Sequence, residues 1–256
     1  MFDLKKVVRP NILKLSPYSS ARDEFVGEAS IWLDANENPF GNLNRYPDPY
    51  QKDLKQLLSE RNEIETDQIF IGNGSDEVID LLFRLCARPG IDQALTFSPT
   101  YGMYQVSAEI NDVELIEVPL DENFQIDLNT TLPFLDDPKL KLIFICSPNN
   151  PTGNLLRNSE IEEILNRFKG IIAIDEAYID FANAESWNKR LNEFPNMIVT
   201  QTFSKARGLA AARLGIAYSN PEIISFLNRI KPPYNVSSLN QQAGIQSLKN
   251  DSKIVQ

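Results

Sequence analysis

Residues 171–178 read IIAIDEAY, and this stretch decides how the rest of the chain is interpreted. Its first four residues form a continuous apolar run, which is typical of a strand buried on both faces of a parallel sheet. The run ends abruptly in Asp175. An ionised carboxylate in that position is costly unless it meets a positive partner, although a helix-capping role is the alternative. The stretch therefore predicts a buried strand with a charged ligand at its carboxyl end.

The same arrangement recurs on both sides of this stretch. Helical patterns such as SDEVIDLLFRLCA and SEIEEILNRF alternate with short apolar runs, which predicts the α/β fold class: three layers, α/β/α, around a mostly parallel sheet. Ligands bind at the carboxyl edge of such sheets, so the polar clusters that follow the runs are expected to converge. These clusters are GNGSDE after IFI (69–71), SPTY after ALTF (94–97), SPNNPTG after LIFIC (142–146), DEAY after IIAI and TFSK after MIVTQ (197–201).

Composition restricts the kind of protein. The 256 residues are 42% hydrophobic and 23% charged, which is ordinary for a globular protein. With 25 basic and 35 acidic residues the net charge is −10, which opposes general binding to nucleic acid or anionic membranes. The sequence contains neither the apolar segment of a signal peptide nor a run long enough for a membrane helix. We therefore expect a cytoplasmic protein.

Cysteine and histidine usage narrows the chemistry. Cys86 and Cys146 are the only cysteines, and two buried thiols are expected rather than a disulfide framework. Histidine is absent, which excludes Ser-His-Asp and Cys-His catalysis and every histidine metal site. No metal site is expected. Acid–base chemistry must then use Lys, Tyr, Asp or Glu.

Lys205, in TQTFSKARG, is the candidate for covalent chemistry. An amine held near carboxylate, phenol, amide and guanidinium groups can form a Schiff base with an aldehyde, while the other groups bind a charged ring and a phosphate. Pyridoxal 5'-phosphate has all of these features. The released amine could also move a proton between substrate and cofactor carbons. An exposed loop lysine is the alternative.

Four further residues could bind the ring of such a cofactor. Asp175 could keep the ring nitrogen protonated, which lets the ring act as an electron sink. Tyr178 and Asn150 could both donate to the ring oxygen, although a packed aromatic and a simple Pro-Gly turn are the alternatives. Tyr101 could stack on the ring or belong to the core.

The phosphate requires a separate set of donors. GNGSDE is a weak dinucleotide fingerprint, because Glu77 stands where the third glycine belongs. Its glycines nevertheless permit a tight turn into a helix whose first amides can bind phosphate. Ser75 as a plain N-cap and Arg213 as a surface residue are the alternatives, although the position of Arg213 favours a buried head group that needs an anion. The predicted phosphate donors are Ser75, the amides of Asp76 and Glu77, Thr202, Ser204 and Arg213.

Together these motifs resemble the fold type I pyridoxal-phosphate-dependent aminotransferases, from about residue 16 to the end. PYSSARDE, LDANENPFG, NRYPDPY, GNGSDEVID, PTYGMYQVSAE and CSPNNPTGN are similar to the subfamily that acts on histidinol phosphate. The resemblance implies an N-terminal arm with part of a small domain at 1–35. It also implies a cofactor-binding large domain at 36–256, which ends at the start of the helix leading to the small domain. We expect that small domain to be truncated here, without the arginines that bind substrate phosphate or carboxylate.

The resemblance also implies individual roles. Lys205, Asp175 and Tyr178 would be catalytic, and Tyr101, Asn150 and the phosphate donors would bind the cofactor. Tyr46 would reach the cofactor phosphate of a neighbouring subunit, which implies a homodimer with shared sites. Tyr18 and Asn36 would border the substrate. The chain departs from the family pattern at Ala211 and Ala212, where Gly-Leu is common.

The implied reaction converts L-histidinol phosphate and 2-oxoglutarate to imidazole acetol phosphate and glutamate, reversibly, in histidine biosynthesis. Two alternatives remain open from the sequence. One is a related pyridoxal-phosphate enzyme, either an aromatic aminotransferase or a phospho-amino-acid decarboxylase. The other is a truncated chain that binds the cofactor without turnover.

Overall fold

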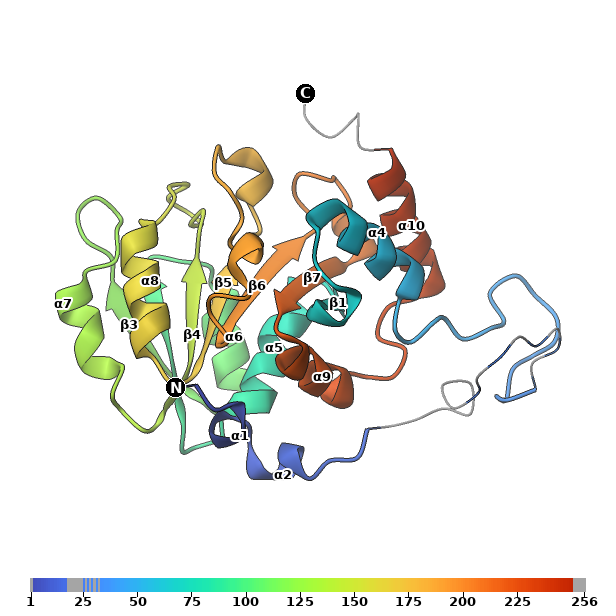
Figure 1. The fold of residues 1–256 in the computed structure, drawn as a ribbon, viewed down its shortest axis with the longest axis horizontal. Coiled ribbons are helices and arrows are strands. Elements are labelled where there is room, and N and C mark those ends of the chain that lie inside the picture. Colours follow the sequence, from blue (N-terminus) through green and yellow to red (C-terminus); the bar gives the residue numbers. More distant parts are fainter. Residues whose placement is uncertain are drawn as a thin grey trace.

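A seven-stranded sheet forms the centre of the protein (Figure 1). The computed structural model describes residues 2–17, 25, 27, 29, 31 and 33–250. The strand order is β1-β7-β6-β5-β4-β2-β3, and the predicted α/β fold class is confirmed. The strands are β1 (Ile69–Asn73), β2 (Gln93–Ser98), β3 (Glu114–Pro119), β4 (Leu140–Cys146), β5 (Ile171–Asp175), β6 (Met197–Thr202) and β7 (Leu214–Ser219).

Strand direction determines which residues meet at the ligand-binding edge. Strands β3, β2, β4, β5 and β6 pair in parallel, whereas β7 is antiparallel to both β6 and β1. Parallel strands need a crossover of a dozen or more residues, and the β6–β7 connection at 203–213 is shorter than that, so the chain turns back. The amino end of β7 therefore lies at the same edge as the carboxyl ends of β1, β2, β4, β5 and β6.

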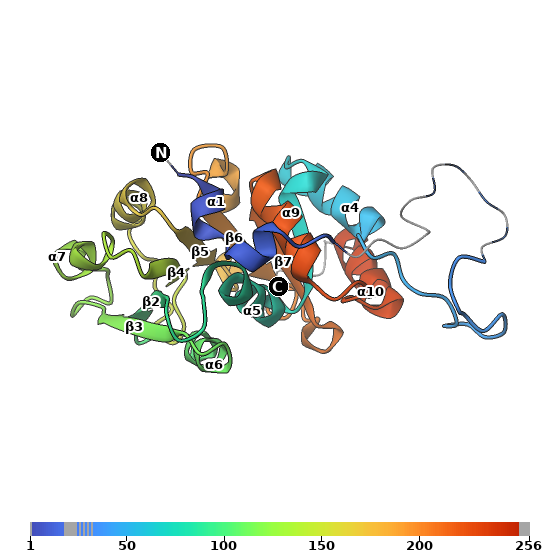
Figure 2. The same ribbon diagram turned by 90° about the horizontal axis from the view of Figure 1, so that it is seen from below.

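Helices cover both faces of the sheet (Figure 2). The longer helices are α4 (Lys52–Asn62), α5 (Ser75–Cys86), α6 (Met103–Ile110), α8 (Asn158–Arg167), α9 (Pro221–Ile230) and α10 (Ser238–Lys249). The short ones are α1 (Leu4–Val7), α2 (Pro10–Leu13), α7 (Leu128–Thr131) and the 3-10 turns η1 (Thr66–Gln68), η2 (Leu132–Phe134), η3 (Ile179–Phe181), η4 (Trp187–Arg190) and η5 (Ala210–Ala212). Helices α5 and α6 lie on the opposite side of the sheet from α8.

The continuous apolar runs are explained by these two layers. In β4, Ile143 and Ile145 join one hydrophobic core with helices α4 and α8, whereas Leu142 and Phe144 join a second core with α5, α6 and α9. Successive side chains of a strand point to opposite faces, so a strand covered on both faces must be apolar throughout. Strand β3, at one edge of the sheet, differs from this pattern and has exposed glutamates.

The amino-terminal region contains more local structure than its sequence pattern indicates. Leu4 and Val7 of α1 are buried in the second core, and the backbone N–H of Arg9 donates to the carbonyl of Leu85 at 2.9 Å. The division of the chain at residue 35 stays a prediction. Cys86 and Cys146 are buried and free, as expected from the sequence. Within the described residues, none of the helices combines the length and apolarity needed to cross a membrane.

Candidate active site

The polar clusters surround one cavity at the carboxyl edge of the sheet. Its empty space is about 580 Å³, a volume that includes open solvent at its mouth. Ten of the residues predicted from the sequence line it together with three others. The lining residues are Ser75, Asp76, Tyr101, Cys146, Asn150, Asp175, Ala177, Tyr178, Thr202, Ser204, Lys205, Ala210 and Arg213.

Asp175 lies at the floor of the cavity, where β5 ends. The residue is only 3% exposed, and its carboxylate accepts hydrogen bonds from the Tyr104 hydroxyl at 2.8 Å and the Ala177 N–H at 3.1 Å. Burial raises the pKa of Asp175, although both hydrogen bonds oppose that shift. The helix-capping alternative is wrong, because the chain continues through a turn and Tyr178 caps the next short helix. A buried carboxylate is therefore available to a cationic ligand.

Tyr104 is a site residue that the sequence reasoning missed. The side chain is fully buried, stacks on Phe144 with ring centroids 4.8 Å apart, and directs its hydroxyl to Asp175. Burial and the neighbouring Asp175 raise the pKa of the phenol well above its ordinary value, so it remains a hydrogen-bond donor. The signal was present in PTYGMY, where Tyr101 and Tyr104 are three residues apart and can share one side of a helical turn.

Lys205 occupies the turn that follows β6. Backbone bonds hold this turn: the Gly208 N–H donates to the Lys205 carbonyl at 2.9 Å, and the Leu209 N–H donates to the Phe203 carbonyl at 3.0 Å. The Lys205 amine lies 5.4 Å from the centre of the Tyr178 ring, within the range of a cation–π contact. Lys205 is exposed on a loop, as the alternative of an exposed loop lysine predicts, but it also lines the cavity.

The amino end of α5 also lines the cavity, through Ser75 and Asp76. Gly74, with φ of 81°, is the N-cap and supplies no side-chain cap, so the N-cap alternative for Ser75 is wrong. Ser75 is instead the first helical residue and lines the cavity. The Glu77 carboxylate turns back to accept from the Asn73 N–H at 2.5 Å and the Asn235 amide at 2.8 Å. Because no side chain caps α5, the amide N–H groups of its first turn are available to an anion.

Arg213 differs from the prediction of a buried head group. Its side chain is 45% exposed, and its guanidinium donates to Asp76 at 3.1 Å and to the Ala210 carbonyl at 3.3 Å. The reason is its position at the amino end of β7, beside the cavity mouth rather than within the sheet. Gly74 lies close to the guanidinium, since a Cβ added there would be 2.6 Å from it, and its φ of 81° favours glycine.

The other predicted residues have more local partners. The Thr202 hydroxyl donates to the Leu214 carbonyl at 3.2 Å and accepts from the Ser204 N–H at 3.1 Å, which holds the Lys205 turn against β7. Tyr101 donates to Asp76 at 3.1 Å, and burial, followed by the Asp76 charge, raises the pKa of Tyr101 to about 12. Tyr101 also packs against the second core and lines the cavity, and its stacking on the ring stays a prediction.

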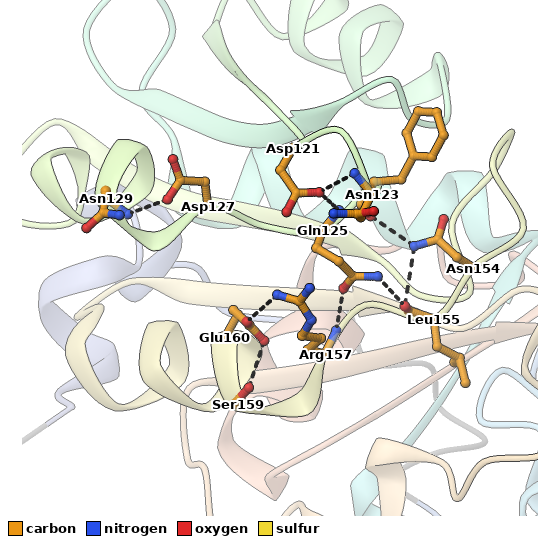
Figure 3. A network of polar contacts seen from close by, with 11 residues as sticks. Asp121, Asn123, Gln125, Asp127, Asn129, Asn154, Leu155, Arg157, Ser159 and Glu160 are labelled. Carbon is orange, nitrogen blue, oxygen red and sulfur yellow. Dashed lines mark hydrogen bonds and ion pairs between the residues drawn. The ribbon is translucent and has the colours of Figure 1, made fainter.

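Asn150 is carried by a loop that polar contacts hold on both sides. On the inner side, Asn149 accepts from the Thr100 hydroxyl at 3.0 Å and donates to Thr152 at 2.8 Å. On the outer side, the Gln125 side chain donates to the Leu155 carbonyl at 3.1 Å and accepts from the Arg157 N–H at 2.9 Å (Figure 3). The SPNNPTG turn is therefore a rigid support for Asn150.

Glu176 is a second residue that the sequence reasoning missed. Its buried carboxylate accepts from the Ser186 hydroxyl at 2.5 Å, the Trp187 N–H at 2.8 Å and the Gln201 amide at 2.9 Å. Burial raises the pKa of Glu176, and these bonds oppose the shift. Because it follows Asp175 directly, it points away from the cavity and fixes the loop that carries Tyr178.

Asn36 and Tyr46, both predicted for the site, do not line this cavity. Both line a separate cavity with Tyr234, and the Tyr46 and Tyr234 rings stack at 4.5 Å. Tyr18 lies outside the described residues.

The donor set fits pyridoxal phosphate. One end of the cavity has a helix amino terminus, hydroxyl groups and the Arg213 guanidinium, which suits a phosphate. The floor has a buried carboxylate with no hydrogen-bonded or ion-paired cation among the described residues, which suits a protonated ring nitrogen. A primary amine, a phenol and an amide lie between these ends.

Comparison with known proteins assigns the class. Residues 21–256 match the family model for aminotransferase class I and II, and the chain belongs to that family.

Within the family, the chain is similar to histidinol-phosphate aminotransferases. It is 52% identical over 256 residues to the one from Cytophaga hutchinsonii and 55% identical over 251 residues to the one from Bacteroides thetaiotaomicron. These matches cover 98% and 97% of this chain and 73% and 72% of the relatives. The solved histidinol-phosphate aminotransferase from Sinorhizobium meliloti, in complex with pyridoxal-5'-phosphate, has a TM-score of 0.75 and 26% identity, covering 82% of this chain and 58% of its own.

Proposed function

We propose that this chain is a pyridoxal-phosphate-dependent aminotransferase that transfers the amino group of L-histidinol phosphate to 2-oxoglutarate. The products are imidazole acetol phosphate and glutamate, the reaction is reversible, and it belongs to histidine biosynthesis. The observation that carries the proposal is the cavity with Lys205, Asp175 and Arg213, in a chain 52% identical to such an enzyme. A cytoplasmic location is part of the proposal, and two buried free thiols support it.

Each cavity residue has a task in this reaction. When bound, pyridoxal phosphate supplies an aldehyde that accepts an amino group and a ring that withdraws electrons. Lys205 binds the aldehyde, and its free amine moves a proton at the substrate α-carbon. Asp175 holds the proton of the ring nitrogen, while Tyr178 and Asn150 donate to the ring oxygen. Ser75, Ser204 and Arg213 bind the phosphate.

The half reaction with glutamate tests the proposed activity. The cofactor-loaded chain is expected to convert the absorption of the bound aldehyde form to that of the amine form after glutamate is added. Recovery of 2-oxoglutarate in equal amount would show that the amino group had been transferred. If the absorption persists at saturating glutamate, the chain binds the cofactor without turnover.

A substrate panel tests the specific assignment. Histidinol phosphate is expected to convert the bound cofactor faster than aromatic amino acids or threonine phosphate do. Carbon dioxide released from threonine phosphate would identify a decarboxylase instead, and a faster reaction with tyrosine or phenylalanine would identify an aromatic aminotransferase.

The partner in the proposal is a second copy of the chain. Tyr46 lies outside its own Lys205 cavity and is half exposed, while Leu33, Phe40 and Leu43 on the same segment are 91%, 82% and 65% exposed. Exposed apolar side chains grouped on one segment favour an interface. In this arrangement Tyr46 contributes to the cofactor phosphate site of the other subunit.

Mixed dimers test the shared site. Lys205→Ala and Tyr46→Ala chains are each expected to be impaired, and a mixture after subunit exchange is expected to exceed the sum of their activities. The gain arises because one site of each mixed dimer has both Lys205 and Tyr46. Activities that only add, or a monomer by sedimentation, would contradict the proposal.

A further inference from the structure

We propose that Tyr104 is a positioning residue that keeps Asp175 ionised and oriented for the ring nitrogen of the cofactor. This inference rests on the proposed function for its catalytic meaning. Its physical basis is the buried hydrogen bond of 2.8 Å from the Tyr104 hydroxyl to the Asp175 carboxylate.

The geometry fixes both partners. The Tyr104 ring stacks on Phe144 with an interplanar angle of 12°, and it meets Tyr101 edge-on with centroids 5.7 Å apart. These contacts leave the phenol little rotational freedom. Its hydroxyl binds one carboxylate oxygen of Asp175, and the Ala177 N–H binds the other at 3.1 Å. Two donors on different oxygens define the plane of the carboxylate.

Few groups around Asp175 stabilise its ionised form. Burial raises the pKa of Asp175 and the negative charge of Asp76 on α5 adds to that shift, whereas the Thr200 side chain on β6 opposes it less than Tyr104 does. Cys146 on β4 also lines the cavity, and burial, followed by the Asp175 charge, raises the pKa of the thiol to about 12, so the thiol stays neutral. Lys205 and Arg213 line the same cavity, but neither has a hydrogen bond or an ion pair with Asp175.

Tyr104 is therefore the side chain that most directly favours the ionised form. A hydrogen bond to a carboxylate stabilises its charged state and lowers its pKa, so loss of the phenol hydroxyl must raise the pKa of Asp175. A higher pKa leaves less of the carboxylate ionised at a given pH. Consequently, the acid side of the pH–turnover profile should move to higher pH.

Tyr104→Phe tests the inference, because it keeps the ring and removes only the hydroxyl. Carbon-13 NMR of aspartate γ-carboxyl groups in the cofactor-free chain follows the titration, with Asp175→Asn identifying the signal. We expect the pKa of Asp175 to rise by about one unit, a tenfold change in its ionisation constant. In the loaded enzyme, the acid limb of turnover is expected to shift in the same direction.

Tyr218→Phe provides the matched control. Tyr218 is also fully buried, but its hydroxyl accepts from the Asn62 amide at 3.1 Å, away from Asp175. This variant should lose stability without changing the Asp175 titration. If the Asp175 titration is the same in Tyr104→Phe as in the unaltered chain, Tyr104 has only a packing role. Because the titration needs no cofactor, that outcome is independent of whether the proposed transamination occurs.

Discussion

Replacement of Lys205 with alanine is expected to abolish covalent attachment of pyridoxal phosphate and to lower turnover by at least about 10⁴-fold. Two tasks are lost together, because the same amine binds the aldehyde and moves the proton. The fold should persist, since Lys205 is exposed and its backbone rather than its side chain holds the turn. Borohydride reduction followed by mass spectrometry measures the covalent adduct directly.

Residual cofactor binding distinguishes the contribution of the Lys205 amine from that of the other cavity residues. The phosphate donors remain in Lys205→Ala, so weakened, noncovalent binding of pyridoxal phosphate is expected in equilibrium dialysis. Lys189→Ala is a suitable control, because Lys189 is an exposed lysine that donates to the Asn62 carbonyl away from the cavity. An unchanged borohydride-trapped adduct in Lys205→Ala would place the covalent bond on another lysine.

The sequence predicts the sheet well because its strands are buried on both faces. IIAI and LIFIC can be recognised from their apolar composition alone, and the polar residues after them must then lie at one edge. The reversal of β7 was not predicted, although it follows from the short β6–β7 connection at 203–213. Its consequence is that Arg213 approaches the cavity from the start of a strand and stays partly exposed.

The remaining parts of the site depend on contacts between residues distant in sequence. Tyr104 and Asp175 are 71 residues apart, and no local pattern predicts that one donates to the other. Glu176 similarly receives its partners from the loop at 186–187 and from β6. The N-cap alternative for Ser75 was wrong for a local reason: Gly74 adopts the positive φ that the turn requires and takes the cap position itself.

Replacement of Asp175 with asparagine is expected to lower turnover by about 10²–10⁴-fold while the fold is retained. Asparagine has nearly the same shape but no negative charge, so it cannot stabilise a protonated ring nitrogen. Single-turnover measurements of the half reaction with glutamate locate the loss in the chemical step rather than in substrate binding. Near-normal rates would exclude the ionic role of Asp175.

The same substitution is not expected to lower the folding stability of the cofactor-free chain, although it lowers turnover. Burial raises the pKa of Asp175 in the folded chain. Its contribution to stability is therefore full below the ordinary aspartate pKa of about 4, and it declines as pH rises through the raised pKa. Asp175→Asn removes that decline, so at neutral pH the variant should be at least as stable as the original chain in urea denaturation.

Asp92→Asn tests the sign of this stability effect, because the pKa of Asp92 is lowered whereas that of Asp175 is raised. Burial would raise the pKa of Asp92, but hydrogen bonds from the Arg88 side chain and backbone, each 2.8 Å, hold it below its ordinary value. Asp92 therefore stabilises the fold above about pH 4 and loses that effect as pH falls. Asp92→Asn should lose stability at neutral pH, whereas Asp175→Asn should not. Equal losses in both variants would mean that Asp175 is a structural carboxylate rather than one held at a stability cost for a cationic ligand.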